Sequence, residues 1–343
     1  MFDINKLVRE NIKRLTPYSC ARDDYKGTTG VFLDANENPF GSLNRYPDPY
    51  QQKLKAAICK IKGVQETSIF LGNGSDEIID LCFRVFCNPG IDKAMIFPPT
   101  YGMYEVSASV NDVAIIKVPL NNEFQINIKE IEPYFKDEKL KLMFICSPNN
   151  PTGNCMNHSD IEYIIRNFDG IVVLDEAYSD FSNEASFIDK TDLYPNLIVM
   201  QTFSKALGLA SVRIGIAFSD PAIIHYFNRI KPPYNISTIN QEAALNKLTD
   251  IELIMKQVNV IKNERERLAS ELASLNITCK VFPSDANFLL IKVKDANNIY
   301  NYLVNNEIIV RNRSSLIDNC LRITVGTKDE NDKLLDALKR INL

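Results

Sequence analysis

Residues 202–215, "TFSKALGLASVRIG", place a lysine and an arginine eight positions apart among hydroxyl-bearing and small apolar residues. Lys205 directly follows Ser204, just beyond the apolar run "NLIVMQ" (196–201). A structural lysine usually lies on a solvated helix face, where its stem covers apolar surface and its ammonium group stays in water. Lys205 is instead expected where a strand meets a turn, which is where α/β proteins carry their chemistry.

Short apolar runs alternate with amphipathic stretches on both sides of this segment. The strand candidates between residues 68 and 218 are "SIFLG", "AMIF", "AIIKV", "LMFICS", "IVVLDE", "LIVMQ" and "RIGIAF". Several are continuously apolar, as in strands that are covered on both faces. Helices are expected between them, for example at "SDEIIDLCFRVFC" and "HSDIEYIIRNF". The alternation predicts an α/β fold with a predominantly parallel, doubly wound sheet.

The pattern changes after about residue 245. A long charged helix is predicted at 251–275, followed by the short strands "CKVF", "NFLLIKV", "IIVRN" and "LRITVG" and by further helices. This tail predicts a smaller α+β domain. We expect an N-terminal segment (1–35) that packs with the small domain, a large domain (36–245) that contains Lys205, and a small C-terminal α+β domain (246–343).

The composition excludes several classes of protein. The chain has 343 residues, of which 45% are hydrophobic and 24% charged, with a net charge of −4. These values are typical of a globular protein and give no sign of nucleic-acid or membrane binding. We see no apolar run long enough to span a bilayer and no secretory signal. The eight cysteines are scattered, Cys20 among them, and neither histidine stands at ligand spacing from one, which predicts reduced thiols in a cytoplasmic protein without a metal site.

The stretch "GNGSDEIIDL" (72–81) is a glycine-rich turn between a predicted strand and a predicted helix. Ser75 and Asp76 stand where the helix begins, and the free N–H groups and the helix dipole at such a place attract anions. A serine or aspartate at a helix start is equally explained as a simple N-cap that needs no ligand. The turn alone therefore leaves both interpretations open.

Asp175 ends the apolar strand of "IVVLDEAY" (171–178), three residues before Tyr178. A carboxylate at the end of a buried strand is costly unless a cation meets it. The aspartate is therefore a candidate partner for a buried positive group, although a structural salt bridge or a helix cap would also explain it.

Two further loops follow predicted strands. In "ICSPNNPTGN" (145–154) two prolines stiffen the chain around Asn150, whose side chain offers both a donor and an acceptor. In "FPPTYGMY" (97–104) a proline pair precedes Tyr101, whose ring is either a stacking platform or part of the core. Each loop by itself is explained as a turn.

Together these groups point to one cofactor. Thr202, Ser204 and Arg213 surround Lys205 and suit a phosphate, because arginine binds phosphate through paired hydrogen bonds. A lysine beside cationic or apolar neighbours has a depressed pKa and becomes a nucleophilic amine. Pyridoxal phosphate needs a phosphate anchor, a stacking ring, an aspartate that keeps its pyridine nitrogen protonated, and a lysine for its aldehyde. The residues therefore predict pyridoxal phosphate as the cofactor.

The motifs resemble those of the fold-type I pyridoxal-phosphate aminotransferases, and most closely the histidinol-phosphate aminotransferase family. The resemblance extends over nearly the whole chain through "LTPYSCAR", "LDANENPFG", "NRYPDPY", "GNGSDE", "PPTYGMY", "CSPNNPTG", "LDEAY", "TFSKALGLASVR", "PPYNIST" and "CLRITVGT". It implies a large domain with a mostly parallel seven-stranded sheet and a smaller α+β domain. One departure is Ser211–Val212, where the family pattern has a glycine and an apolar residue before the arginine.

The resemblance also implies the roles of the residues around the cofactor ring. Lys205 would form the covalent link to the cofactor and, once displaced by substrate, move the Cα proton. Asp175 would pair with the pyridinium nitrogen. Asn150 and Tyr178 would hydrogen-bond the phenolic oxygen of the ring, and Tyr101 would stack on it.

For the anionic groups the resemblance implies further residues. The cofactor phosphate would be held by Ser75, Asp76, Thr202, Ser204 and Arg213. Tyr46 would reach the same phosphate from the neighbouring subunit, which implies a homodimer with shared sites. Arg322 would bind the carboxylate of glutamate, and Arg311 would bind a substrate phosphate, although Arg313 stands close by. The substrate pocket would be lined by Tyr18, Asn36 and Tyr234.

The resulting prediction is amino transfer between L-histidinol phosphate and 2-oxoglutarate, a step of histidine biosynthesis that gives imidazole acetol phosphate and glutamate. Threonine-phosphate decarboxylase and aromatic amino-acid aminotransferase activity stay open within the same fold. A dinucleotide-dependent oxidoreductase would also use a doubly wound sheet, but "GNGSDE" lacks the G-x-G-x-x-G spacing and Lys205 would have no role in it. A non-catalytic binding protein is the remaining alternative.

Overall fold

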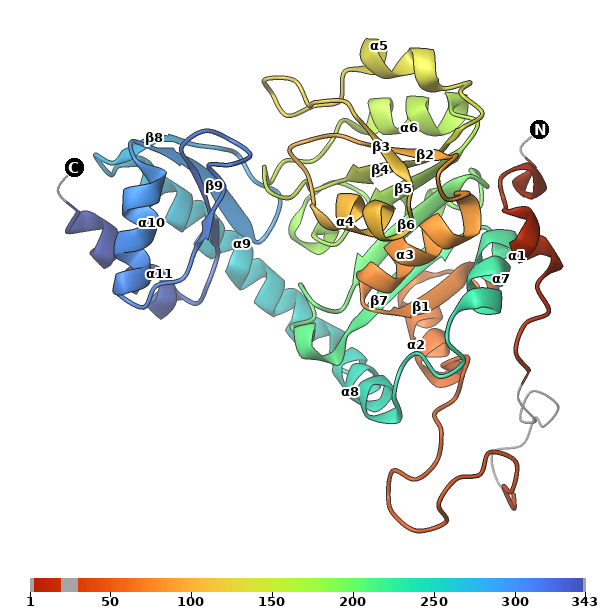
Figure 1. Cartoon of the computed structure of the whole chain (residues 1–343). Coiled ribbons are helices and arrows are strands. Elements are labelled where there is room, and N and C mark those ends of the chain that lie inside the picture. Colours follow the sequence, from red (N-terminus) through yellow and green to blue (C-terminus); the bar gives the residue numbers. More distant parts are fainter. Residues whose placement is uncertain (1–2, 20–29, 342–343) are drawn as a thin grey trace.

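The computed structural model of the chain describes residues 3–19 and 30–341 (Figure 1). Cys20 and the end of the motif at 15–22 lie outside the described residues. In the described part of the chain the larger sheet consists of β1 (Ile69–Asn73), β2 (Lys93–Ile96), β3 (Ala114–Lys117), β4 (Leu140–Cys146), β5 (Ile171–Asp175), β6 (Leu197–Thr202) and β7 (Ile214–Ser219).

The strands of this sheet lie in the spatial order β1-β7-β6-β5-β4-β2-β3. The pairs from β6 to β3 are parallel, whereas β7 runs antiparallel to both of its neighbours, β1 and β6. This confirms the predicted α/β fold with a mostly parallel seven-stranded sheet. The antiparallel β7 has a consequence for function, because the beginning of β7 lies at the same edge of the sheet as the ends of β4, β5 and β6.

Helices cover both faces of the large sheet. Alternation along β5 sends Val172 and Leu174 into one core and Ile171 and Val173 into the other, which is why this strand is continuously apolar. One face packs against α2 (Gln52–Lys62), α5 (Ile128–Ile131), α6 (His158–Asn167) and α8 (Thr238–Leu248). The other face packs against α1 (Glu10–Arg14), α3 (Ser75–Phe86), α4 (Met103–Val110) and α7 (Pro221–Ile230).

Short 3₁₀ helices connect several of these elements. They are η1 (Ile4–Lys6), η3 (Glu66–Ser68), η4 (Glu132–Tyr134), η5 (Ser179–Phe181), η6 (Phe187–Lys190) and η7 (Ala210–Val212). The last of them leads directly into β7. It therefore fixes how the chain returns from the loop of Lys205 to the sheet.

The smaller sheet is antiparallel, in the order β10-β11-β9-β8. It contains β8 (Thr278–Val281), β9 (Phe288–Val293), β10 (Arg311–Asn312) and β11 (Cys320–Thr324), and it packs with α10 (Ala296–Asn305) and α11 (Lys328–Lys339) around a core of its own. The 23-residue α9 (Ile251–Ala273) joins the two sheets, as Figure 1 shows.

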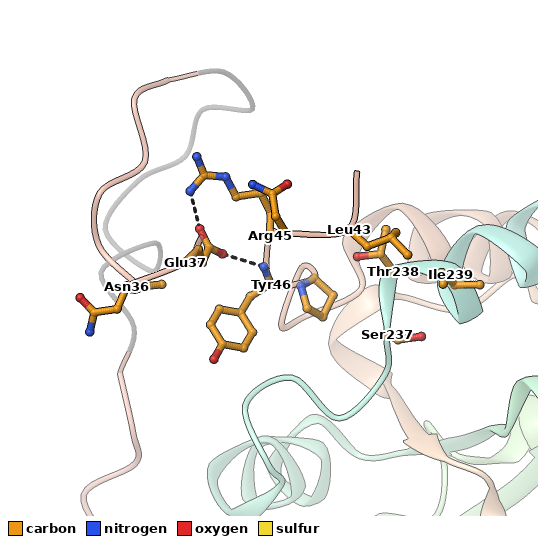
Figure 2. A pocket seen from close by; sticks show the side chains of 11 residues that line it. Asn36, Glu37, Leu43, Arg45, Tyr46, Ser237, Thr238 and Ile239 are labelled. Atoms are coloured by element: carbon orange, nitrogen blue, oxygen red, sulfur yellow. Dashed lines mark hydrogen bonds and ion pairs between the residues drawn. The ribbon is translucent and has the colours of Figure 1, made fainter. Parts of the chain in front are cut away.

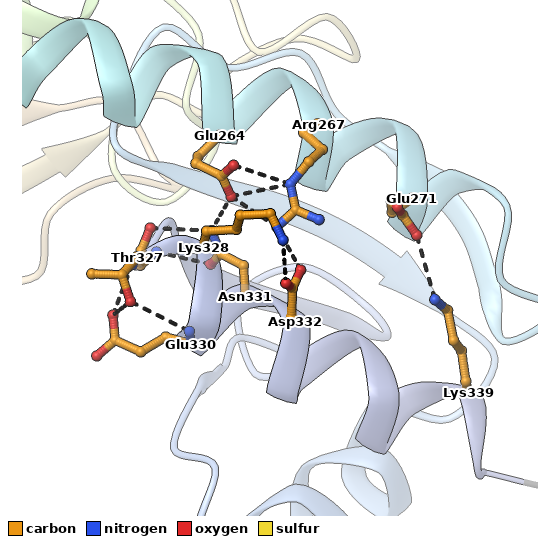
Figure 3. A network of polar contacts seen from close by, with 10 residues as sticks. Glu264, Arg267, Glu271, Thr327, Lys328, Glu330, Asn331, Asp332 and Lys339 are labelled. Carbon is orange, nitrogen blue, oxygen red and sulfur yellow. Dashed lines mark hydrogen bonds and ion pairs between the residues drawn. The ribbon is translucent and has the colours of Figure 1, made fainter.

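Polar contacts fix α11 against α9 (Figure 3). Arg267 of α9 forms ion pairs with Glu264 and with Asp332 of α11, each at 2.8 Å. The buried Asn331 donates to Glu264 at 3.0 Å and to the carbonyl oxygen of Gly326 at 3.1 Å. Because ion pairs near the surface contribute little on their own, we assign most of the specificity of this contact to the buried asparagine.

The small sheet is held to the loops that follow β4 and β5. Arg265, a buried residue of α9, donates from Nη1 to the carbonyl oxygens of Phe181 (3.2 Å) and Ala286 (3.0 Å). The Asp285 N–H donates to the carbonyl oxygen of Gly153 at 2.7 Å. These bonds set where the strand that carries Arg322 lies relative to the large sheet.

The N-terminal segment takes a different position from the expected one. Val8 and Ile12 are buried in the core formed with α3 and α7, and the Arg9 N–H donates to the carbonyl oxygen of Val85 in α3. We expected this segment to pack with the small domain, and within the described chain it packs on the large sheet instead.

Among the described residues, no helix combines the length and the apolar character that crossing a membrane requires.

Candidate active site

A cavity of about 150 Å³ opens at the edge of the large sheet where β4, β5 and β6 end. It contains every cofactor residue that the sequence predicts except Tyr46. Its lining consists of Ser75, Asp76, Tyr101, Cys146, Asn150, Asp175, Ala177, Tyr178, Thr202, Ser204, Lys205, Ala210 and Arg213. Residues from five separate stretches of the sequence therefore meet at one sheet edge, as expected for a doubly wound sheet.

Lys205 stands in the turn after β6, with Nζ at 5.4 Å from the centroid of the Tyr178 ring. Burial lowers the pKa of its ammonium group, and the positive charges of Arg322 and Arg213 lower it further, against the opposing charge of Asp175. A lower pKa increases the fraction of neutral amine, which is the nucleophilic form. The position of Lys205 thus suits attack on a carbonyl group.

Asp175 ends β5 and is buried. The Tyr104 hydroxyl donates to Oδ2 at 2.6 Å, and the Ala177 N–H donates to Oδ1 at 3.1 Å. Burial raises the pKa of this carboxyl group, and the hydrogen bond from Tyr104 is the largest opposing influence. A buried carboxylate at a cavity wall is suited to a cationic ligand group.

The sequence analysis missed Tyr104 as a residue of the site. The only available signal was its place in the quoted stretch "PPTYGMY", three positions after Tyr101. Cys146 was also missed as a lining residue. It pairs with Asp175 across β4 and β5, which places its thiol beside the carboxylate.

The turn before α3 and the start of β7 together form a site that suits an anion, which we call the cradle. Gly74 has φ +77°, and a Cβ there would lie 2.6 Å from Nη2 of Arg213. A Cβ on Gly215 would lie 2.4 Å from the backbone nitrogen of Ser75. Arg213 itself adopts φ +55°, a conformation that is rare for a residue with a side chain and is typical of functional sites. The close approach brings the arginine to the N-terminus of a 12-residue helix, where anions bind.

Asp76 connects this cradle to Tyr101, whose side chain also lines the cavity. Its Oδ2 accepts a hydrogen bond from Arg213 Nη2 at 3.3 Å, and its Oδ1 accepts one from the Tyr101 hydroxyl at 3.2 Å. The Thr202 and Ser204 hydroxyls lie 3.1 Å apart on the other side of the cradle. The cradle therefore combines a guanidinium group, two hydroxyls and free helix N–H groups.

Asn150 faces the cavity from the loop after β4. Its Nδ2 donates to the Tyr178 hydroxyl oxygen at 3.4 Å, and its Oδ1 accepts from Nη1 of Arg322. Arg322 lies in β11, with its guanidinium 5.2 Å from the centroid of the Phe288 ring. The small sheet thus contributes a cation to a cavity that the large sheet forms.

Three arginines gather on this side of the small sheet. Arg311 pairs with Arg322 across β10 and β11, and Arg313 follows two positions later with its N–H on the carbonyl oxygen of Cys320. Within residues 3–19 and 30–341, none of the three has a carboxylate within 4.0 Å, and Nε of Arg313 and of Arg322 is buried without a hydrogen-bond partner. Like charges that gather without an acid are suited to a multiply charged anion.

Arg311 and Arg322 stand beside the cavity without lining it, and four further predicted residues, Tyr18, Asn36, Tyr46 and Tyr234, also lie outside it in the single chain. Tyr46 stacks on Tyr234 with ring centroids 4.4 Å apart, and its N–H donates to Glu37 at 2.6 Å. Figure 2 shows Asn36 and Tyr46 beside a separate cavity of about 360 Å³. Tyr18 is 72% exposed and lines a third, smaller pocket together with Pro49 and Arg229. The structure of one chain therefore does not bring these four residues to Lys205.

Comparisons with known proteins agree with this geometry. Residues 22–338 match the family model described as aminotransferase class I and II. The chain is 52% identical over 344 residues to a histidinol-phosphate aminotransferase of Bacteroides fragilis, covering 99% of both chains. The crystal structure of the histidinol-phosphate aminotransferase from Clostridium acetobutylicum is similar, with a TM-score of 0.80, 26% identity and coverage of 87% of this chain and 90% of that one.

A second solved structure shares the fold and carries a cofactor. The histidinol-phosphate aminotransferase from Sinorhizobium meliloti in complex with pyridoxal-5'-phosphate has a TM-score of 0.78 to this chain, at 24% identity, and the match covers 89% of each chain.

The close approach at Gly215 gives a testable prediction. Gly215→Ala places a methyl group against the backbone of Ser75, and we expect the resulting displacement to destabilise the protein by about 1–3 kcal/mol. Gly102→Ala is the matched control, because no atom lies within 4 Å of the added Cβ and φ is −67°. Thermal unfolding should show a lower midpoint for the first variant alone; equal midpoints would contradict the packing described for the cradle.

Proposed function

The chain belongs to the class I and II aminotransferases, and from this premise we propose that it transfers the amino group of L-histidinol phosphate to 2-oxoglutarate with pyridoxal phosphate as cofactor. The observation that carries the proposal is that the buried Asp175 and the amine of Lys205 line one cavity. On the small sheet beside it lie three arginines that have no carboxylate within 4.0 Å among the described residues. The names of relatives about half identical over the full length support the choice of substrates.

The residues of the cavity are chemically suited to this cofactor. Gly74 and Gly215 let Arg213 and the start of β7 approach the N-terminus of α3, where a side chain on either glycine would clash, and this brings the donors that suit a phosphate together. Lys205 offers an amine of lowered pKa, and Asp175 offers a buried carboxylate. When bound, pyridoxal phosphate supplies the electron sink that receives the electron pair left behind as the substrate Cα–H proton departs.

The protein groups around the ring then have separate tasks. Lys205 would hold the cofactor before substrate arrives, and its freed amine would afterwards move the proton from the substrate Cα to a carbon of the cofactor. The Asp175 carboxylate keeps the proton on the ring nitrogen. Asn150 and Tyr178, whose polar atoms face one another at 3.4 Å, would donate to the ring oxygen. Tyr101, which lines the cavity, would stack on the ring.

The phosphate group is held by the cradle. Arg213, the hydroxyls of Thr202 and Ser204, and the N–H groups at Ser75 all donate to it. Asp76 has no donor for a phosphate when it is ionised. We therefore assign to it the orientation of Arg213 and Tyr101, the two side chains to which it is bonded.

For the substrates we propose that Arg322 binds the carboxylate of 2-oxoglutarate or glutamate. Arg311, which stands opposite Arg322 in the register of the small sheet, binds the phosphate of the amino donor. Arg322 also donates to Asn150, so that Asn150 links substrate binding at the small sheet to cofactor binding at the large one.

The division into domains at 36–245 and 246–343 is part of this proposal, supported by the separate cores of the two sheets.

We also propose a homodimer with shared sites. The segment around residues 30–50 extends away from the body of the chain in Figure 1, and Val31, Leu33 and Phe40 have exposed fractions of 83–90%. Apolar side chains exposed to this degree on one segment are typical of an interface. If a second chain covers this segment, Tyr46 would reach the cofactor phosphate of the partner. Asn36, Tyr18 and Tyr234 would line the substrate pocket.

The function is tested by following the cofactor absorption band of the loaded protein after single additions. We expect L-histidinol phosphate to remove the band and 2-oxoglutarate to restore it. Carbon dioxide release from threonine phosphate would instead identify a decarboxylase, and a response to phenylalanine alone would identify an aromatic aminotransferase. No change with any of the three would contradict the proposal.

The arginine assignments predict different effects on the two substrates. Arg311→Gln removes charged hydrogen bonds to the donor phosphate and should raise KM for histidinol phosphate about 10- to 100-fold, leaving KM for 2-oxoglutarate nearly unchanged. Arg322→Gln should raise KM for 2-oxoglutarate by a similar factor. Steady-state kinetics of Arg313→Gln is the comparison: if that variant shows the selective loss and Arg311→Gln does not, the phosphate assignment moves to Arg313.

Shared sites predict complementation between two damaged chains. Lys205→Ala removes the amine from a chain's own cavity, and Tyr46→Ala removes the group that the chain lends to its partner. A mixed dimer contains one site with both native residues, so unfolding and refolding a mixture should give more activity than the average of the two separately refolded variants. Activity equal to that average would show that Tyr46 does not act across the interface.

A further inference from the structure

We propose that Tyr104 is a positioning residue of the reaction: its hydroxyl holds the Asp175 carboxylate ionised and in the orientation that a protonated pyridine nitrogen requires. The inference rests on the function proposed above, because it presumes that Asp175 faces the ring nitrogen. It adds a residue that does not line the cavity and that acts only through the aspartate.

The geometry leaves the Tyr104 hydroxyl little freedom. The side chain of Tyr104 is fully buried, and its ring stacks on Phe144 at 4.9 Å and meets Tyr101 edge-on at 5.5 Å. The ring is thereby fixed on two sides, and its hydroxyl lies 2.6 Å from Oδ2 of Asp175. A length of 2.6 Å is typical of a hydroxyl bound to an ionised carboxylate.

Asp175 receives a second donor on its other oxygen. The Ala177 N–H reaches Oδ1 at 3.1 Å, so that each oxygen of the carboxylate is bonded to the protein once. Two donors on opposite oxygens fix the plane of the carboxylate. Each oxygen still has a lone pair for a cationic donor in the cavity.

The charged and titratable groups around Asp175 come from several elements. Asp76 of α3 disfavours the ionised form, and Lys205 after β6 favours it. Cys146 of β4, Tyr101 before α4 and Tyr178 after β5 also face it, and burial raises the pKa of all three above the ordinary values, which keeps them neutral. Among all these influences, the hydrogen bond from Tyr104 is the largest that opposes burial.

The sign of the effect follows directly. Without the hydroxyl, the pKa of Asp175 rises further, because burial is then less opposed. The carboxyl group becomes protonated at a higher pH, and a protonated carboxyl cannot stabilise a pyridinium. Cofactor affinity should therefore be lost first on the acid side, whereas a purely structural defect would weaken binding equally at every pH.

The test is equilibrium binding of pyridoxal phosphate to the apoprotein across a range of pH. We expect Tyr104→Phe, which keeps the ring, to bind about 10- to 100-fold more weakly on the acid side and to approach the unaltered protein as pH rises. In the loaded enzyme the acid limb of kcat/KM should move up by about one pH unit. A uniform loss, or an unchanged pH dependence, would overturn the proposal.

Tyr194→Phe is the matched control. Tyr194 is also buried, and its hydroxyl oxygen accepts a hydrogen bond from Arg166 at 2.8 Å, but it precedes β6 and so lies at the opposite edge of the sheet from the cavity. This variant also loses a hydroxyl bonded to a charged group, and the pH dependence of cofactor binding should stay unchanged.

A second replacement covers the case in which Tyr104→Phe does not fold. Replacement of Tyr104 by 3-fluorotyrosine keeps the ring and makes the hydroxyl a stronger donor, so the acid limb should move to lower pH; no movement would contradict the proposal. Because the equilibrium binding of pyridoxal phosphate needs no amino donor, that measurement separates the two hypotheses. A shift in the pH dependence of cofactor binding together with silence towards histidinol phosphate would reject the proposed substrate and keep the role of Tyr104.

Discussion

A carboxylate buried at the end of a parallel strand is the constraint on which the rest of this site depends. Asp175 can stay ionised there only if donors and a cation compensate for the water that it has lost. Tyr104 and Ala177 supply the donors, and the positive charge of Lys205 favours the ionised form. Burial also lowers the pKa of Lys205, so that the same cavity prepares both the acid and the amine for their tasks.

The part of the site that suits a phosphate depends on β7, which runs antiparallel to its neighbours in the otherwise parallel sheet. If β7 were parallel, its beginning would lie at the opposite edge, far from the start of α3. Because β7 is antiparallel, Arg213 arrives beside Gly74, and the absence of side chains at Gly74 and Gly215 lets the two backbones approach. A left-handed conformation at Arg213 completes the turn, and Asp76 holds the guanidinium in place.

The small sheet contributes charge rather than a surface for the cofactor. It presents Arg322 to Asn150, and Arg265 in α9 fixes its position through backbone carbonyls of both parts of the chain. The two sheets have separate cores, but a further buried cluster that includes Tyr178, Ala206 and Phe288 joins them beside the site.

The sequence by itself determined the strands, the order of the motifs and the residues that gather at the ends of β4, β5 and β6. Continuous apolar runs are local signals of buried strands, and Lys205 and Asp175 stand at the ends of such runs. The fold class then places these strand ends at one edge of the sheet.

The packing of the N-terminal segment on α3 and α7 could not be predicted, because its short amphipathic pattern fits the core of either sheet. Tyr104 was missed for a similar reason: a buried tyrosine on a helix is usually core, and only the three-dimensional structure shows that its hydroxyl meets Asp175. Tertiary structure also decided the position of Tyr46 outside its own cavity, since the distance between segments far apart in the sequence is set by packing and not by local pattern.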